Sequence, residues 1–273
     1  MMNTTNYQSL CSSVQEIARD TGSFIRSEHE KISEQDVELK SVASLVTYVD
    51  KTAETRIVES LKKLIAGSGF ITEEGTATHS DEHFKWIVDP LDGTTNYIHG
   101  LSPHSVSIAL MEGEELVLGV VYEIGLDEMF YAWKGSPAFL NGKEIKAARR
   151  EKLEDTLIST GFPYYNFERF NDYMGALQHL MKSTRGLRRM GSAAVDLAYV
   201  AAGRFDAFFE HALHAWDVAA GGFILQQAGG KVTDFKGGKN WLFSGEIAAA
   251  SNHCFPSFYE IIHRYLGEKT QNA

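Results

Sequence analysis

The segment at residues 86–97 constrains the fold more than any other part of the 273-residue chain. An apolar run at 84–88, with the length of a buried strand, leads directly into it. Because proline cannot donate a hydrogen bond to a sheet, we expect that strand to stop at Asp89-Pro90. Gly93 permits a tight turn, and Thr94-Thr95 can open a helix. The segment therefore predicts a strand, a turn and a helix in immediate succession.

This turn carries chemical groups of two kinds. Asp89 and Asp92 supply carboxylates, and a helix that starts at Thr94 has free backbone N–H groups at its first turn. Hard cations such as Mg²⁺ take oxygen ligands and often share them with a phosphate, while helix N-termini bind anions. The alternative is a turn without a ligand, since these residue types are common in turns. An EF-hand fits less well, because its third position would be Leu91 and its glycine comes fifth.

Two further acidic segments fall at the ends of predicted elements. Glu73-Glu74-Gly75 follows the short apolar run Phe70-Ile71, and Asp217 lies in the first turn of a helix predicted from Trp216. Either segment could have a plain structural role, as a solvated turn or as a helix cap. Together with the two aspartates of the turn, they place four carboxylates at element ends, where α/β proteins build their sites.

The rest of the chain indicates layers of helices and strands. Helical periodicity predicts helices over 10–25 and 46–64, and three apolar segments between 105 and 133 predict an antiparallel meander. The second half alternates: strand-like segments at 156–160, 205–209 and 247–250, and helices at 167–182, 192–202, 216–227 and 257–266. We therefore expect an α/β (α+β) fold with a joint near the polar run 146–155. Residues 1–150 would form one part and residues 151–273 the other.

Composition excludes several classes of function. The chain has 26 Lys plus Arg against 36 Asp plus Glu, a net charge of −10, which argues against a nucleic-acid partner. Cys11 and Cys254 lie far apart and have no disulfide or metal-type spacing, as expected in a reducing compartment. No apolar run approaches the roughly 20 residues needed to span a bilayer, and no signal peptide is evident. We expect a cytoplasmic protein without a membrane partner.

On these segments the sequence resembles the inositol monophosphatase family of Mg²⁺-dependent, lithium-sensitive phosphatases. The resemblance covers roughly residues 8–266, and Thr47-Tyr48-Val49-Asp50 and Asn141-Gly142 also stand where the family pattern has them. Three ordered segments carry it, namely Glu73-Glu74-Gly75, residues 86–97 and residues 216–221. The resemblance implies an α-β-α-β-α sandwich, two or three Mg²⁺ per site, a homodimer, and a small phosphorylated polyol or sugar as substrate.

The resemblance also implies roles for individual residues. Its metal ligands would be the carboxylates of Glu73, Asp89, Asp92 and Asp217 and the backbone carbonyl of Leu91. Glu73 and Thr94 match the pair that orients the attacking water, and Asp50 matches the acid that supports this threonine. The substrate would contact two sets of residues. They are the phosphate loop Gly93, Thr94 and Thr95, and the region that meets the sugar or inositol hydroxyls, Asp92, Gly191, Ser192, Ala193, Glu210 and Asp217.

The implied activity is hydrolysis of inositol monophosphate by a metal-activated water. One alternative is a related sugar-bisphosphate or adenosine-bisphosphate phosphatase, although the Thr94-Thr95-Asn96-Tyr97 run favours the inositol type. A second alternative is a regulatory binding module that keeps the fold. Two weaker features remain. His211 and His214 have the spacing of a zinc pair without a recognisable third ligand, and three arginines at 185, 188 and 189 form either surface charge or a contact with a substrate or subunit.

Overall fold

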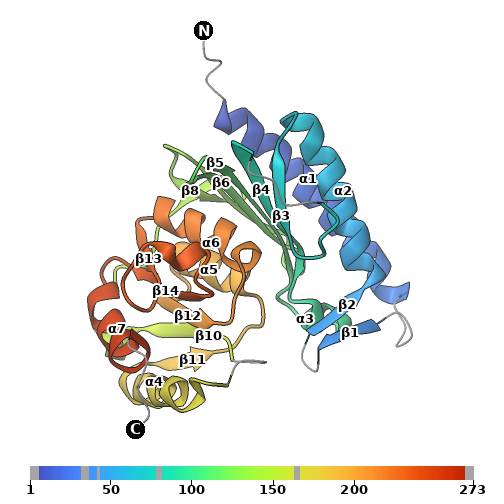
Figure 1. The fold of residues 1–273 in the computed structure, drawn as a ribbon. Coiled ribbons are helices and arrows are strands. Elements are labelled where there is room, and N and C mark those ends of the chain that lie inside the picture. Colours follow the sequence, from blue (N-terminus) through green and yellow to red (C-terminus); the bar gives the residue numbers. More distant parts are fainter. Residues whose placement is uncertain (1–5, 32–36, 42–43, 78–81, 163–166, 268–273) are drawn as a thin grey trace.

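The computed structural model describes residues 6–31, 37–41, 44–77, 82–162 and 167–267, and it consists of stacked layers of helices and sheets (Figure 1). The helices are, in chain order, α1 (Tyr7–Glu28), α2 (Tyr48–Leu64), α3 (Thr94–Ile98), α4 (Phe170–Ser183), α5 (Ala193–Ala201), α6 (Ala215–Gln227) and α7 (Phe255–Ile262). Helices α1 and α2 pack on the outer face of one sheet, α4 and α7 on the outer face of the other, and α5 and α6 lie between the sheets. The α-β-α-β-α sandwich expected from the sequence is confirmed.

The first sheet has the strand order β3-β4-β5-β6-β7-β8-β9. Its strands are β3 (Gly69–Thr72), β4 (Phe84–Asp92), β5 (Ser105–Glu112), β6 (Glu115–Glu123), β7 (Glu128–Trp133), β8 (Ala138–Leu140) and β9 (Lys143–Ile145). β5, β6 and β7 form the expected antiparallel meander. Asn141 and Gly142 both have positive φ and turn the chain between β8 and β9. β3 and β4 run parallel, so the segments that follow them emerge at the same edge of the sheet.

The expectation that β4 stops at Pro90 is wrong. The strand continues to Asp92, and it pairs with β5 first through Asp89 opposite Ser107 and then through Asp92 opposite Ser105. The register shifts between these two pairs, as at a β-bulge, so Pro90 is not required to donate to the ladder. On its other side, the pairing of β4 with β3 extends only as far as Val88. A bulge therefore lets the strand carry both aspartates.

The second sheet is mixed and has the order β11-β10-β12-β14-β13. Its strands are β10 (Leu157–Thr160), β11 (Gly186–Arg188), β12 (Ala207–His211), β13 (Gly230–Thr233) and β14 (Glu246–Ser251). A small separate pair, β1 (Val37–Ser41) and β2 (Ser44–Thr47), precedes α2, so that helix begins at Tyr48 and not at residue 46. The division of the chain into parts 1–150 and 151–273 stays a prediction. None of the helices among the described residues is long and apolar enough to cross a membrane.

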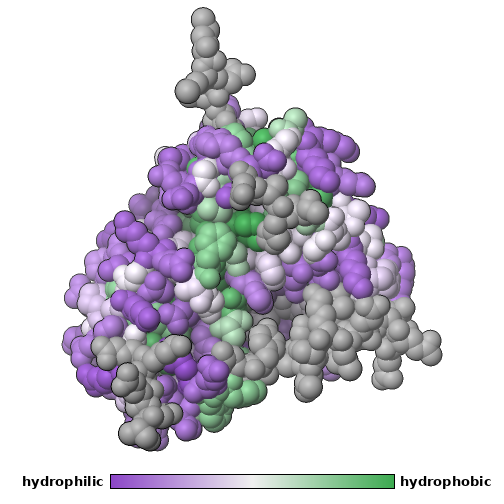
Figure 2. All heavy atoms as spheres, viewed as in Figure 1, coloured by the Kyte–Doolittle hydropathy of each residue, from purple (hydrophilic) through white to green (hydrophobic). Residues whose placement is uncertain are grey.

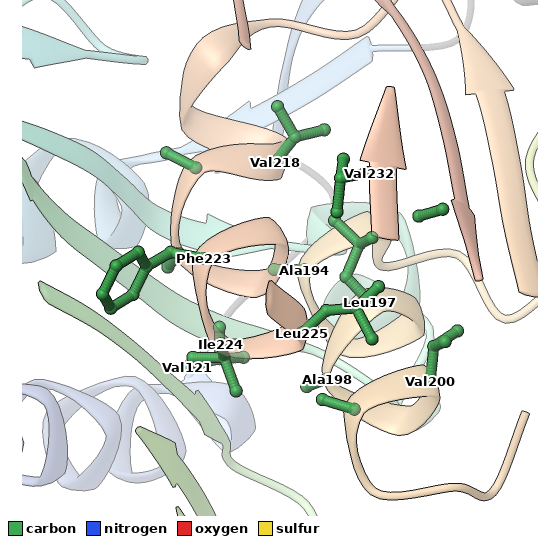
Figure 3. Packing of buried hydrophobic residues seen from close by; sticks show 14 of the residues in the cluster. Val121, Ala194, Leu197, Ala198, Val200, Val218, Phe223, Ile224, Leu225 and Val232 are labelled. Atoms are coloured by element: carbon green, nitrogen blue, oxygen red, sulfur yellow. The ribbon is translucent and has the colours of Figure 1, made fainter. Parts of the chain in front are cut away.

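The central helices pack closely enough to bind the two sheets into one core. Leu197 and Ala198 of α5 share one buried cluster with Ile224 and Leu225 of α6 (Figure 3). The close approach of these elements depends on glycines, which have no side chain. A Cβ at Gly119 of β6 would lie 2.8 Å from the Ala220 carbonyl oxygen, and one at Gly221 would lie 2.7 Å from Leu197. This packing fixes where the N-termini of α5 and α6 lie relative to the first sheet.

Candidate functional site

Glu73 and Asp89 lie at neighbouring points because β3 and β4 are parallel and their pairing ends at Thr72 opposite Val88. The Glu73 N–H donates to the Val88 carbonyl oxygen at 3.3 Å, which ties the segment after β3 to β4. Asp89 is buried, and its Oδ1 accepts a 2.9 Å hydrogen bond from the Leu91 N–H. Burial raises the pKa of Asp89 well above its usual value, and the neighbouring charges of Glu73, Asp92 and Asp217 raise it further. The two segments thus deliver adjacent acids to one sheet edge.

Asp92 makes a contact of a different kind, across to the second half of the chain. Its Oδ2 accepts from the Ser192 hydroxyl at 2.7 Å and from the Ala194 N–H at 2.8 Å. Ser192 is the N-cap of α5, as predicted, so the Asp92 carboxylate sits at the positive end of that helix. Burial raises the pKa of Asp92 to about 6, although the donors of Ser192 and Ala194 oppose this increase. Asp92 therefore links the first sheet to the central layer.

Asp217 enters from α6. It occupies the first turn of the helix, as predicted, and its Oδ2 accepts a 2.6 Å hydrogen bond from the His214 N–H. Burial raises the pKa of Asp217 well above its usual value, with the charges of Asp92 and Glu73 as further causes. The charges of Glu73, Asp92 and Asp217 all act on Asp89, so the four carboxylates lie close together. The structure thus brings the four predicted acids into one cluster.

The chemistry of this cluster fits a hard cation, because its donors are oxygens and a cation would offset the repulsion between them. Within the described ranges, no three acidic, histidine or cysteine side chains are grouped as the ligands of a metal ion would be. Asp89, Asp92 and Asp217 each have one oxygen engaged by a backbone or hydroxyl donor. Because the raised pKa values favour the protonated acids, binding of a cation would displace protons.

Asp50 connects α2 to the turn after β4. Its Oδ2 accepts from the backbone N–H and the hydroxyl of Thr47, at 2.8 and 2.7 Å, which forms the N-terminal capping box of α2. Its Oδ1 lies 3.0 Å from the Thr94 hydroxyl, and that hydroxyl is also 3.0 Å from the Leu91 carbonyl oxygen. A hydroxyl has one proton, so Thr94 donates to one of these acceptors at a time. The structure places Thr94, Asp50 and Leu91 together.

Gly93 and Gly191 meet where the two halves of the site touch. Gly93 is the N-cap of α3 with a φ of +90°, and Thr94 and Thr95 form the first turn of this helix. A Cβ at Gly93 would lie 3.0 Å from the Pro103 carbonyl oxygen and 3.1 Å from that of Gly191. The side-chain amide of Asn96 donates to the carbonyl oxygens of Pro103 and Met190, at 2.7 and 2.9 Å. Sequence reasoning did not assign Asn96 this role, since the residue stood out only as part of a family-like run.

Glu210 lies on β12 and faces the same region as the acidic cluster. Burial raises its pKa well above the usual value, and the charges of Asp196, Asp217 and Asp92 add to the effect. The charge of Arg189 opposes it. Asp196, a buried residue of α5, is a second acid here that sequence reasoning missed, because its position on a helix gave it no motif. Ser192 and Ala193 open the same helix, so the predicted substrate region is continuous with Asp92.

The weaker sequence features do not form a separate site. His211 packs its ring against Tyr173 at 5.2 Å, whereas His214 stacks on Trp216 at 4.5 Å, so the two imidazoles have different partners. No group of metal ligands includes them within the residues that the structure describes. Of the three arginines, Arg185 pairs with Asp155 at 2.8 Å on the surface, and Arg189 influences Glu210 and Asp196. The zinc hypothesis thus gains no support, and Arg185 and Arg189 interact with different acids.

Comparison with known proteins places these observations in context. The model of the inositol monophosphatase family matches residues 6–271. An inositol-1-monophosphatase of Rhizobium meliloti is 41% identical over 254 residues, covering 93% of this chain and 92% of that protein. The Nus factor SuhB of Pseudomonas aeruginosa is 39% identical over 254 residues, covering 91% of this chain and 94% of that protein. The crystal structure of the extragenic suppressor protein suhB of Bartonella henselae has a TM-score of 0.89 at 37% identity, covering 93% of this chain and 98% of that chain.

Proposed function

The chain belongs to the inositol monophosphatase family, and on that premise we propose that it hydrolyses a phosphate monoester, inositol monophosphate, with the help of Mg²⁺. One observation carries this proposal. The acids of the cluster, Glu73, Asp89, Asp92 and Asp217, gather beside the first turn of α3, where backbone N–H groups and threonine hydroxyls can receive a phosphate. Cation ligands and anion donors therefore share one site.

These acids and the Leu91 carbonyl would hold two or three Mg²⁺ ions. When bound, the ions would lower the pKa of the attacking water and stabilise negative charge on the leaving oxygen. The chain's own residues supply the orientation. Thr94, with its hydroxyl donating to Asp50 at 3.0 Å, keeps a lone pair of that hydroxyl available to accept from the water. Glu73 is the second group proposed to orient this water.

Substrate selection would depend on the second half of the chain. Gly93, Thr94 and Thr95 would take the phosphate, and Glu210 with the segment from Gly191 to Ala193 would meet the hydroxyls of the alcohol. Glu210 is buried and lies within electrostatic reach of Asp217 and Asp92. A carboxylate in such a place can accept hydrogen bonds from hydroxyl groups of the substrate. This arrangement supports a polyol or sugar as the leaving group.

A substrate panel with purified protein tests the proposal. Phosphate release would be measured from inositol monophosphate, fructose bisphosphate and adenosine 3′,5′-bisphosphate, each with Mg²⁺ and after chelation. We expect Mg²⁺-dependent release that is fastest from inositol monophosphate, with activity lost in Asp92→Asn. Faster release from either bisphosphate would favour the alternative substrate class. Activity that survives chelation, or full activity in the variant, would refute the metal-dependent mechanism.

A relative that is named as a Nus factor supports a second candidate, a binding role beside catalysis. The fold and the acidic cluster would then be retained while another surface recognises a partner. A pull-down with wild type and Asp92→Asn separates the two functions. Specific capture of a partner that persists in the inactive variant would support a binding role, and capture that requires turnover would argue against it.

We also propose a cytoplasmic homodimer that lithium inhibits. Both cysteines are free and buried, which suits a reducing compartment.

The proposed dimer contact would cover large apolar side chains that are exposed on α4 and on the segments before it. Figure 2 shows apolar residues near the lower edge of the molecule, where α4 lies in Figure 1. They are Phe162, Phe167, Phe170, Met174 and Met181. Light scattering would give the oligomeric state, and Li⁺, a small hard cation, would be titrated against Mg²⁺ in the activity assay.

A further inference from the structure

Glu54 is a buried carboxylate of α2 that the proposed mechanism does not use. Its side chain is fully buried. Its Oε2 accepts a 2.7 Å hydrogen bond from the Glu74 N–H, and its Oε1 accepts from the N–H and the hydroxyl of Thr76, at 2.8 and 2.7 Å. A buried charge is costly unless it is well satisfied, and three donors satisfy this one. All three donors belong to the loop that begins with Glu73.

The local backbone explains why this loop can bind a carboxylate. Gly75 lies between the two donor residues and has a φ of +68°, a conformation that glycine adopts without strain. It allows the N–H groups of Glu74 and Thr76 to turn toward the same carboxylate, an arrangement that favours anions. On the opposite side, the Glu73 N–H is bonded to the Val88 carbonyl oxygen of β4. The loop is therefore fastened to α2 and to β4 at once.

Asp50 and Glu54 are four residues apart on α2, so they lie on the same face of the helix. Asp50 contacts Thr94 in the turn after β4, and Glu54 contacts the loop after β3. One helix thus holds both acidic segments of the first half of the chain. Its rigid spacing sets where Glu73 stands relative to Thr94.

We infer that Glu54 is a positioning residue for Glu73: by accepting three hydrogen bonds from the Glu74–Thr76 loop, it holds the Glu73 carboxylate where a metal ion is bound. This inference rests on the proposed function of Glu73 as a metal ligand. Groups that orient metal ligands typically contribute about 10–100-fold to metal affinity or activity. The role is distinct from packing, because it predicts an effect on Mg²⁺ affinity that exceeds any effect on folding.

The test compares Glu54→Gln with Glu59→Gln. Both are the same substitution on α2, but Glu59 is exposed. In Glu54→Gln, the new side-chain amide has one acceptor oxygen and an NH₂ group that faces a donor, so the loop loses part of its anchor. Hydrogen–deuterium exchange of the metal-free proteins would follow the amides of residues 73–77, and calorimetry would measure Mg²⁺ binding. We expect faster exchange confined to these amides, and Mg²⁺ affinity lower by about tenfold, in Glu54→Gln alone.

Thr76→Val provides a second variant, since it removes one donor and leaves Glu54 in place. We expect it to weaken Mg²⁺ binding in the same direction and by less. Unchanged exchange at 73–77, or Mg²⁺ affinity equal to that of Glu59→Gln, would overturn the inference. So would exchange that rises equally throughout α2 and the first sheet, because that result shows a general packing role. If wild type binds no Mg²⁺, the proposed function fails, while the exchange of residues 73–77 still decides whether Glu54 holds the loop.

Discussion

The two aspartates of the β4 turn stand three residues apart and have different surroundings. Asp89 is held within the first sheet, and three other carboxylates lie close enough to raise its pKa. Asp92 reaches the N-terminus of α5, where Ser192 and Ala194 donate to it and limit the increase of its pKa to about 6. The comparison shows that the site has two parts. Around Asp89, acids repel one another, whereas around Asp92 the N-terminus of α5 stabilises the carboxylate. The acids around Asp89 are the ones proposed to bind a cation, and the contact of Asp92 with α5 joins the two halves of the molecule.

Asp89→Asn gives the largest expected effect. The neutral amide keeps an oxygen to accept from the Leu91 N–H, but it removes the charge of an acid whose pKa is raised by burial and by three neighbouring carboxylates. Since a metal ligand should matter more than the groups that orient it, we expect kcat/KM to fall by more than about 100-fold. The melting temperature of the metal-free protein should stay equal or rise, because repulsion is relieved. A lower melting temperature together with retained activity would contradict the claim that Asp89 lies among repelling acids and is needed for activity.

The pH dependence of Mg²⁺ binding tests the same cluster of acids. Because burial and like charges raise the pKa of these acids in the folded state, the folded protein binds more protons than the unfolded chain. The Asp92 contribution to metal-free stability therefore declines as pH rises from about 4 through about 6. Mg²⁺ affinity should increase over the same range, by up to about tenfold per pH unit for each proton released. Calorimetry in buffers of different ionisation enthalpy measures that release, and Asp92→Asn should reduce it.

Ser192→Ala tests the contact between Asp92 and the N-terminus of α5. It removes one donor to Asp92 and the N-cap of α5, so we expect a loss of about 1 kcal/mol of stability. Activity should fall by about tenfold, because the donor also orients a proposed metal ligand. Asn6→Ala is the matched control, since Asn6 caps α1 on the outer layer. Thermal unfolding should show similar losses of stability in both variants. Equal activities would contradict the claim that the α5 N-terminus orients Asp92 for activity.

Glu210→Gln should have the smallest effect on rate. The amide retains the size of the side chain but changes how it meets substrate hydroxyls, and removal of its charge should ease the repulsion from Asp196 and Asp217. We expect KM for inositol monophosphate to rise by several-fold, about 1 kcal/mol in binding, with kcat little changed. Steady-state kinetics separate the two constants. A fall in kcat at constant KM would indicate that Glu210 acts on the reacting atoms and does not bind the substrate hydroxyls.

Much of this architecture follows from sequence patterns because local chemistry determines it. The meander, the Ser192 cap and the position of Asp217 in the first turn of α6 depend on periodicity and capping, which neighbouring residues set. Pro90 misled the prediction, since a bulge in the pairing with β5 removes the need for its missing N–H. That register shift depends on tertiary contacts, and no residue next to the proline indicates it.

The supporting residues of the site were harder to find than its acids. Asp89 and Asp92 stand in a dense motif, whereas Glu54, Asn96 and Asp196 act through backbone groups or charges that lie far away in sequence. Asn96 contacts the carbonyl of Met190, 94 residues along the chain. Such pairs form only after the sheets and central helices have packed. The catalytic and binding roles of the individual residues stay predictions until the variants are measured.

The bond from Asp92 to the start of α5 also has a consequence for how the protein is made. A ribosome delivers residues 73–92 well before residues 192–194, and it delivers Asp217 later still. Until then a nascent chain carries the acids of the first sheet without the donors that moderate Asp92 and without the fourth carboxylate. Synthesis therefore imposes an order: the proposed metal site would be completed only when the central layer emerges, and a product that ends before α5 would lack part of the site proposed to bind Mg²⁺.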